Sequence, residues 1–177
     1  TPLTDEVLRN PPAADWPMWR RTYNSWGHSP LDQINRSNVR NLQLAWSFAM
    51  VPNNRSEQTP LVANGIMFLS SPNSVMHALN AATGQLLWEY RRKLPEGETG
   101  VLRNAAIYGD AVYIATVDAH IVALDARTGA VRWDTEVADY KKGYGYTSGP
   151  IVVKGKVITG MGGCARFFAD SCFITAH

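Results

Sequence analysis

The chain has 177 residues, of which 45% are hydrophobic, and a formal net charge of only +2 at pH 7. That length allows a sizeable core, whereas the small and scattered charge argues against nucleic acid or an anionic membrane surface as the main partner. No apolar stretch approaches the roughly 20 residues of a transmembrane helix.

Residues 1–48 are interpreted as a leader that ends in a closing strand. Residues 1–15 are polar and contain proline, so we expect an extended arm. Trp16, Trp19 and Trp26 fall within eleven residues, a density that suits a segment wrapped on the outside of a larger body.

Two short elements are expected in the second half of this leader. The stretch 35–42 offers Asn35 or Ser37 as an N-cap and predicts one short helix. Apolar and polar residues then alternate over 42–48, which predicts a strand.

An eleven-residue motif follows and occurs twice. Its copies, ALNAATGQLLW at 78–88 and ALDARTGAVRW at 123–133, lie 45 residues apart without a gap. The apolar run favours a strand. The Asn or Asp can hydrogen-bond the amides of the next turn, and the Gly can adopt a positive φ. Each copy therefore predicts strand, turn and strand, and their recurrence indicates a repeat architecture.

A second tight turn lies about twenty residues before the Thr-Gly turn of each motif and recurs once more. These turns are Asn64-Gly65, Gly109-Asp110 and Lys154-Gly155. Two turns in each period of about 45 residues predict a four-stranded antiparallel sheet, the blade of a β-propeller. One blade cannot bury both faces alone, so blades stack, and the recurring Trp is a natural filler between them.

The sequence therefore predicts an all-β fold in which the whole chain, 1–177, is part of a single propeller domain. The expected blades are blade one at 56–92, blade two at 101–139 and an incomplete blade three at 145–177. In many propellers an N-terminal strand completes the last blade and closes the ring, and 42–48 is the candidate for that role.

The third repeat departs from the first two after Gly160. It carries an insertion with Cys164 and Cys172, which could close a short disulfide in an oxidising compartment or remain two free thiols. The chain stops at His177, where the earlier copies continue into the turn. We expect an N-terminal fragment of a longer propeller, because propellers need roughly four to eight blades. The fragment alone should be marginally stable and without independent activity.

Three polar loops precede the first strands of the three expected blades. They are 56–59, 93–100 and 141–148. Connections on one face of a propeller line its central channel, so we expect these loops to converge into a polar site.

Several segments carry a resemblance to a known family. They are Asp15-Trp-Pro, Ser29-Pro-Leu-Asp-Gln-Ile-Asn35, Asn38-Val, Leu44-Ala-Trp46 and the two Trp motifs. In these the chain resembles the quinoprotein alcohol dehydrogenases, the pyrroloquinoline quinone (PQQ) enzymes related to methanol dehydrogenase. The resemblance begins at Asp15, covers nearly the whole chain and implies an eight-bladed propeller held by tryptophan-docking repeats.

The resemblance also implies cofactor contacts. Glu57 matches the family glutamate that contacts PQQ, Arg103 the arginine that pairs with its carboxylate or quinone oxygens, and Thr147 a hydroxyl that hydrogen-bonds it. Gly162 and Gly163 match the small residues against which the planar rings lie. A tricarboxylate ortho-quinone needs a guanidinium, several donors and flat walls, which this set supplies.

Two positions differ from the family pattern. Many relatives carry adjacent cysteines in the loop before the arginine, where this chain has Glu-Gly-Glu-Thr at 96–99. The place of the family's metal-ligating glutamate is taken by Ala165, so Asp170 is a weak candidate ligand for Ca²⁺ or a lanthanide. The catalytic base is expected beyond His177, and no catalytic residue is assigned.

The resemblance implies a periplasmic, PQQ-dependent enzyme that oxidises a small alcohol to an aldehyde or ketone and passes electrons to cytochrome c. A further C-terminal domain with haem c is left open. The competing hypothesis is a non-enzymatic propeller scaffold of the bacterial envelope with PQQ-like repeats. Such a scaffold would share the Trp motif but lack Glu57, Arg103 and the leader at 15–35, so these features favour the enzyme.

Overall fold

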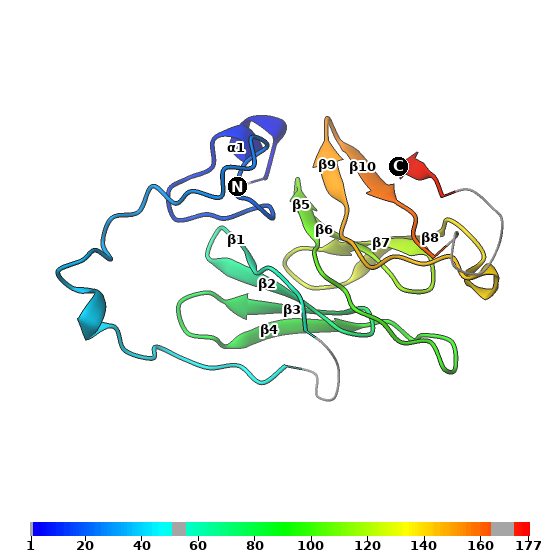
Figure 1. Cartoon of the computed structure of the whole chain (residues 1–177), viewed down its shortest axis with the longest axis horizontal. Helices are drawn as coiled ribbons and strands as arrows, with labels where there is room; N and C mark the ends of the chain where they lie inside the picture. The colour runs from blue at the N-terminus through cyan, green and yellow to red at the C-terminus, as the bar shows by residue number, and fades with distance from the viewer. Residues whose placement is uncertain (1, 51–55, 164–171) are drawn as a thin grey trace.

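The structure, a computed structural model, describes residues 2–50, 56–163 and 172–177. Its strands form successive antiparallel sheets in the orders β1-β2-β3-β4, β5-β6-β7-β8 and β9-β10-β11 (Figure 1). The strands are Leu61–Ala63 (β1), Ile66–Ser71 (β2), Val75–Asn80 (β3), Leu86–Arg91 (β4), Ala106–Tyr108 (β5), Ala111–Ala115 (β6), His120–Asp125 (β7), Val131–Glu136 (β8), Ile151–Val153 (β9), Lys156–Gly160 (β10) and Ile174–Ala176 (β11). The helical elements are α1 (Asp5–Arg9) and the 3-10 turns η1 (Val39–Asn41) and η2 (Tyr140–Lys142). The all-β propeller class is confirmed.

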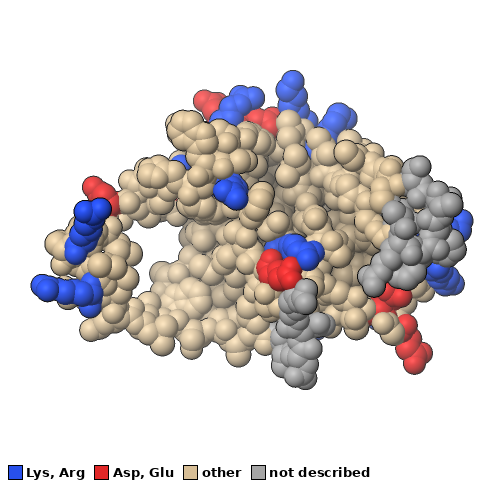
Figure 2. Space-filling model, viewed as in Figure 1, with Lys and Arg blue, Asp and Glu red and all other residues tan. Residues whose placement is uncertain are grey.

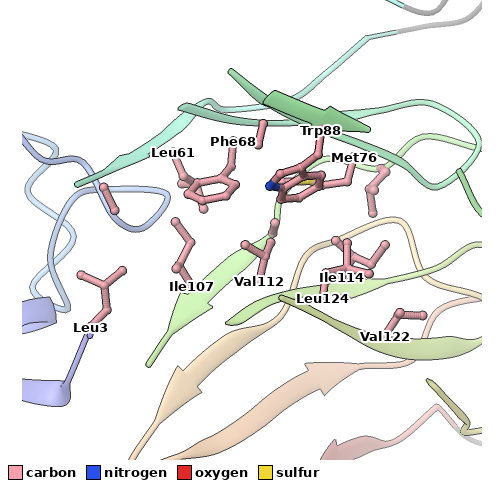
Figure 3. Packing of buried hydrophobic residues seen from close by; sticks show 14 of the residues in the cluster. Leu3, Leu61, Phe68, Met76, Trp88, Ile107, Val112, Ile114, Val122 and Leu124 are labelled. Carbon is pink, nitrogen blue, oxygen red and sulfur yellow. The ribbon is translucent and has the colours of Figure 1, made fainter. Parts of the chain in front are cut away.

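The main core lies between the first and second sheets. Phe68, Met76 and Trp88 of the first sheet face Ile114 and Leu124 of the second (Figure 3). A second buried cluster joins the second and third sheets; it includes Ile121, Tyr146, Val152 and Val157. Each sheet is therefore stabilised by burying apolar side chains against the next, as expected of stacked blades.

Each Trp motif turns as its sequence predicts. The Asp125 Oδ1 atom accepts hydrogen bonds from the Arg127 and Thr128 amides at 3.0 and 2.9 Å, and Gly129 has a φ of +73°. The Asn80 side chain caps the matching turn of the first sheet through two amides, at 3.0 and 3.2 Å. The short polar residue and the glycine together close the turn.

Trp88 docks on the turn of the following repeat. Its Nε1 atom donates to the Ala126 carbonyl at 3.1 Å. The indole ring covers Gly129, where an added Cβ would lie 2.6 Å from the ring. Glycine is therefore needed here for the left-handed backbone and for the close approach of the ring.

The same contact occurs one repeat earlier. Trp46 donates from Nε1 to the Ala81 carbonyl at 3.2 Å, and an added Cβ at Gly84 would lie 2.6 Å from its ring. A tryptophan of one repeat thus seats on the Thr-Gly turn of the next. The predicted role of Trp88 as a filler between blades is confirmed, and Trp46 belongs to the same series.

The expected extended arm at 1–15 is wrong. Residues Asp5–Arg9 form helix α1, whose N-cap is Thr4, and acidic residues occupy the first turn. Leu3 and Leu8 are each only 2% exposed and belong to the main core. Because most residues of this segment are polar, the sequence did not indicate that Leu3 and Leu8 are buried.

The leader is tied to all three sheets at one end of their first strands. The contacts are the backbone pairs Leu3–Gly109 and Trp16–Val62 and a hydrogen bond from the Lys154 amide to Asp5, at 2.9 Å. That Lys154 amide bond lowers the pKa of Asp5 below its usual value. The leader therefore covers the end of the sheets that carries the tight turns between first and second strands.

The expected helix at 35–42 is a single 3-10 turn, Val39–Asn41. Its neighbours bond locally instead: Asn38 Oδ1 accepts from the Asn35 amide at 2.8 Å, and Asn35 Oδ1 from the Ser37 amide at 3.0 Å. Such side-chain contacts compete with helical hydrogen bonds, which explains the shorter element.

The segment 42–48 also differs from its prediction. It forms no strand with any described residue, and its role as the strand that closes the ring stays a prediction. Trp46 and Phe48, two of its alternating apolar residues, are half-buried. The centroids of the Phe48 and His77 rings lie 5.2 Å apart. The blue-to-cyan chain before β1 bows away from the sheets in Figure 1, and Figure 2 shows an opening between it and the body.

The docking contact predicts the effect of an added methyl group. Replacing Gly129 with Ala should cost about 1–2 kcal/mol of unfolding free energy for the left-handed backbone, and about 1–3 kcal/mol more for the clash with Trp88. Gly65→Ala is the matched control, since Gly65 has a φ of +77° and nothing within 4 Å of an added Cβ. Urea unfolding of both variants measures the difference; equal losses would contradict the docking account.

Candidate functional site

Three of the predicted site residues lie at equivalent points of the three repeats. Glu57, Arg103 and Thr147 each precede the first strand of a sheet by three or four residues. Arg103 joins them: its Nη2 atom lies 2.7 Å from Glu57 Oε2, and its Nη1 atom donates to the Thr147 carbonyl at 3.0 Å. We call these three residues the loop row.

The loop row lies at the end of the first strands opposite the tight turns that the leader covers. Each first strand is three residues long, enters from the loop row and leaves into the turn that the leader covers. The backbone repeats this link, since the Thr59 amide donates to the Arg103 carbonyl at 3.3 Å. The loops therefore converge as the sequence predicts.

The ion pair of the loop row is partly open to solvent. The side chains of Arg103 and Glu57 are 36% and 32% exposed. An ion pair this exposed contributes little to stability. A guanidinium has five N–H donors, and its contacts with described residues engage two nitrogens, so the group can also receive an anion.

A pocket of about 750 Å³ adjoins the loop row. Glycine backbone forms much of its wall, through Gly100, Gly143, Gly145, Gly162 and Gly163. Polar and aromatic side chains complete it, among them Glu98, Thr99, Lys141, Tyr144 and Thr147, with Val117 between the loops. We call it the glycine pocket, and Thr147 belongs to both the pocket and the loop row.

The predicted site residues thus fall into two linked groups. Thr147, Gly162 and Gly163 line the glycine pocket, whereas Arg103 lines a neighbouring, mostly apolar cavity of about 460 Å³ against the leader. The hydrogen bond from Arg103 to Thr147 connects the two groups. The described lining of the glycine pocket does not include Glu57.

The two predicted glycines lie where two backbone segments pack closely, and the packing requires glycine at Gly163. Gly162 exchanges backbone hydrogen bonds with Gly145 at 3.0 and 3.3 Å. Gly163 has a φ of +81°, and an added Cβ would lie 1.9 Å from the Gly143 carbonyl oxygen. Two backbone segments therefore meet without side chains and leave a flat wall.

The metal and cysteine predictions fall largely outside the described residues. Asp170, Ala165 and Cys164 lie in the segment 164–171 that the structure does not describe. Cys172 is disulfide-bonded. Within the described ranges, no group of three or more His, Cys, Asp or Glu side chains could hold a metal ion.

The sequence patterns did not predict a buried ion pair that lies next to the glycine pocket. Asp118 is 4% exposed and pairs with Arg92, the residue after β4, at 2.8 Å. The available signal was an acidic residue inside the apolar run 111–124. A charge in such a run indicates a buried partner.

A family model decides the relationship. The model for the β-propeller domain of glucose, ethanol and alcohol dehydrogenases, the PQQ domain, matches residues 16–166. The chain belongs to the PQQ β-propeller family. Its repeats and turns are thus those of a PQQ propeller domain.

Comparisons with known proteins also support this membership. The dehydrogenase subunit of a quinone-dependent alcohol dehydrogenase from Komagataeibacter europaeus is 41% identical over 92% of this chain and 23% of its own length. A cytochrome c-dependent 1-butanol dehydrogenase from Thauera butanivorans is 37% identical over 85% of this chain and 22% of its own. The quinohemoprotein alcohol dehydrogenase from Comamonas testosteroni superposes with a TM-score of 0.88 at 34% identity, over 99% of this chain and 27% of that one.

The chain thus spans under a quarter of the length of these two curated relatives. Among its described residues, helices are too short to cross a bilayer.

Replacing Arg103 with Gln tests how the loop row is held together. Because the ion pair is exposed, the unfolding free energy should fall by under about 1 kcal/mol. Amide hydrogen exchange over 143–148 should nevertheless speed up, since the Thr147 carbonyl loses its donor. Arg127→Gln, which changes an exposed arginine of the docking turn, is the control and should leave that loop unchanged. Unaltered exchange in the Arg103 variant would count against the link.

Proposed function

We propose that the full-length protein carrying this PQQ domain is a PQQ-dependent alcohol dehydrogenase. It oxidises a small alcohol to an aldehyde or ketone. The observation that carries the proposal is the loop row: three equivalent loops place Glu57, Arg103 and Thr147 in contact beside a glycine-walled pocket.

The residues of the site fit PQQ. The glycine pocket has the size of a small-molecule site, typically about 300–1,000 Å³. Added Cβ atoms at Gly145 and Gly163 would collide with backbone, so the wall stays flat enough for a planar ring system. Arg103 and Thr147 would hold carboxylate or quinone oxygens, and Gly162 and Gly163 would border the rings.

The protein's own groups would bind and orient this cofactor. Glu57 holds the guanidinium of Arg103 through the 2.7 Å ion pair, which fixes the direction of its donors. The positive charge of Arg103 favours a polyanionic ligand, and the walls of the pocket exclude water from one side. Bound PQQ supplies an ortho-quinone that accepts two electrons from the alcohol.

A metal ion completes the proposed site. Ca²⁺ and lanthanide ions take oxygen ligands, and the described residues contain no group of three suitable side chains. Asp170 is the proposed protein ligand from this chain, in the insertion that follows the two glycines of the family pattern. It lies in the segment outside the described residues.

The proposed location is the periplasm, and the proposed electron acceptor is a cytochrome c. The disulfide at Cys172 supports an oxidising compartment. A relative named as cytochrome c-dependent supports the acceptor, and a structural neighbour named as a quinohemoprotein supports a search for haem c in the full-length protein.

Reconstitution tests the proposal. Full-length apoprotein is titrated with PQQ in the presence of Ca²⁺ or a lanthanide, and binding is followed by quenching of tryptophan fluorescence. Alcohol oxidation is then assayed with 1-butanol and an artificial electron acceptor. We expect saturable binding by the wild type, activity that requires PQQ, and at least about tenfold weaker binding by Arg103→Gln, since it loses a charge-assisted contact of roughly 1.5–3 kcal/mol.

Arg127→Gln is again the matched control and should bind PQQ like the wild type. Absence of PQQ binding by folded wild-type protein with either metal would contradict the enzyme proposal. That result would favour the scaffold propeller.

A further inference from the structure

The turn between β6 and β7 is buried, unlike the exposed tight turns at the other end of the sheets. Its four residues, Thr116, Val117, Asp118 and Ala119, are all less than 9% exposed. It lies at the same end of the second sheet as the loop row. A buried hairpin turn needs partners for its polar groups.

An ion pair between two sheets supplies those partners. Arg92 directly follows β4, and its Nε atom lies 2.8 Å from both carboxylate oxygens of Asp118. The Thr116 hydroxyl donates to Asp118 at 2.6 Å. Arg92 also reaches Asp134 at 2.7 Å. Burial lowers the pKa of Arg92, but the hydrogen bonds with Asp134 and Asp118 outweigh this and raise it.

The turn held in this way inserts Val117 between the two loops of the glycine pocket. An added Cβ at Gly100 would lie 2.5 Å from a Val117 methyl group, and one at Gly145 would lie 2.5 Å from the Val117 carbonyl oxygen. The Tyr146 amide donates to the Thr116 carbonyl at 3.2 Å. Both loops therefore rest directly on this turn.

The corresponding turn of the first sheet joins the same structure. The Val117 amide donates to the buried Ser74 hydroxyl at 3.3 Å. The Asn73 amide donates to the Gly100 carbonyl at 2.8 Å. Two adjacent turns and the Arg92–Asp118 pair thus fix where the loop at Gly100 lies.

We propose that Arg92 and Asp118 are positioning residues for the cofactor pocket. They fix the β6–β7 turn, and through Val117 they set the distance between the loops 98–100 and 143–147. The inference rests on the proposed PQQ-binding function. It predicts that cofactor affinity depends on an ion pair that does not touch the cofactor.

The test compares Asp118→Asn with a double variant, Arg92→Met with Asp118→Leu, in the full-length apoprotein. Asp118→Asn removes the buried charged partner of the Arg92 guanidinium and leaves it only the more exposed Asp134. The double variant removes both charges, and buried ion pairs replaced by apolar side chains often keep or gain stability. PQQ affinity is measured by fluorescence titration, and thermal unfolding shows that each variant is folded at the titration temperature.

We expect both variants to bind PQQ about tenfold or more weakly, because small misplacements of binding groups are costly. Amide exchange at Gly100 and Gly145 should speed up in both. Arg132→Gln is the matched control. Arg132 pairs with Asp110 and Asp125 at the other end of the same sheet, so its loss should leave PQQ affinity unchanged.

Wild-type affinity in the folded double variant would overturn the inference and leave the proposed function intact. A purely structural role would lower the melting temperature of Asp118→Asn without weakening PQQ binding by the double variant. Failure of the wild type itself to bind PQQ would overturn the proposed function and this inference together.

Discussion

The docking of a tryptophan on the Thr-Gly turn of the next repeat is the contact on which the arrangement of sheets depends. Trp46 and Trp88 make it twice, each with an indole N–H donated to a turn carbonyl and a ring laid over a glycine. The contact fixes both the distance between neighbouring sheets and their register. Burial of apolar side chains supplies most of the stabilisation, but burial is not directional, and the docking contact selects one geometry.

This fixed geometry makes a site from loops that are far apart in the sequence. Because the repeats superpose, residues at equivalent points lie next to one another, and Arg103 can contact Glu57 on one side and Thr147 on the other. The leader packs on the tight turns at the opposite end, so the two ends of the sheets have separate roles. At one end the leader packs against the sheets. The other end carries the charged groups, the hydroxyl groups and the glycine backbone of the site.

The predictable parts were those encoded locally. The motif with its short polar residue, glycine and tryptophan predicted turns and stacking, and the family resemblance pointed to Glu57 and Arg103. Helix α1 was missed because its anchor, Leu3, pairs with Gly109, which lies more than a hundred residues later. The Arg92–Asp118 pair was missed for the same reason, since it forms only when two sheets stack. Sequence patterns show which residues are unusual, whereas their partners depend on the packed fold.

The most direct test of the central claim is the PQQ content of the full-length protein isolated from its native source. The protein would be denatured, and the released cofactor quantified by absorbance and mass spectrometry against the protein concentration. The account predicts about one PQQ per chain, because one loop row and one glycine pocket form one site. No PQQ in a folded protein, also after incubation with PQQ and Ca²⁺ or a lanthanide, would contradict it.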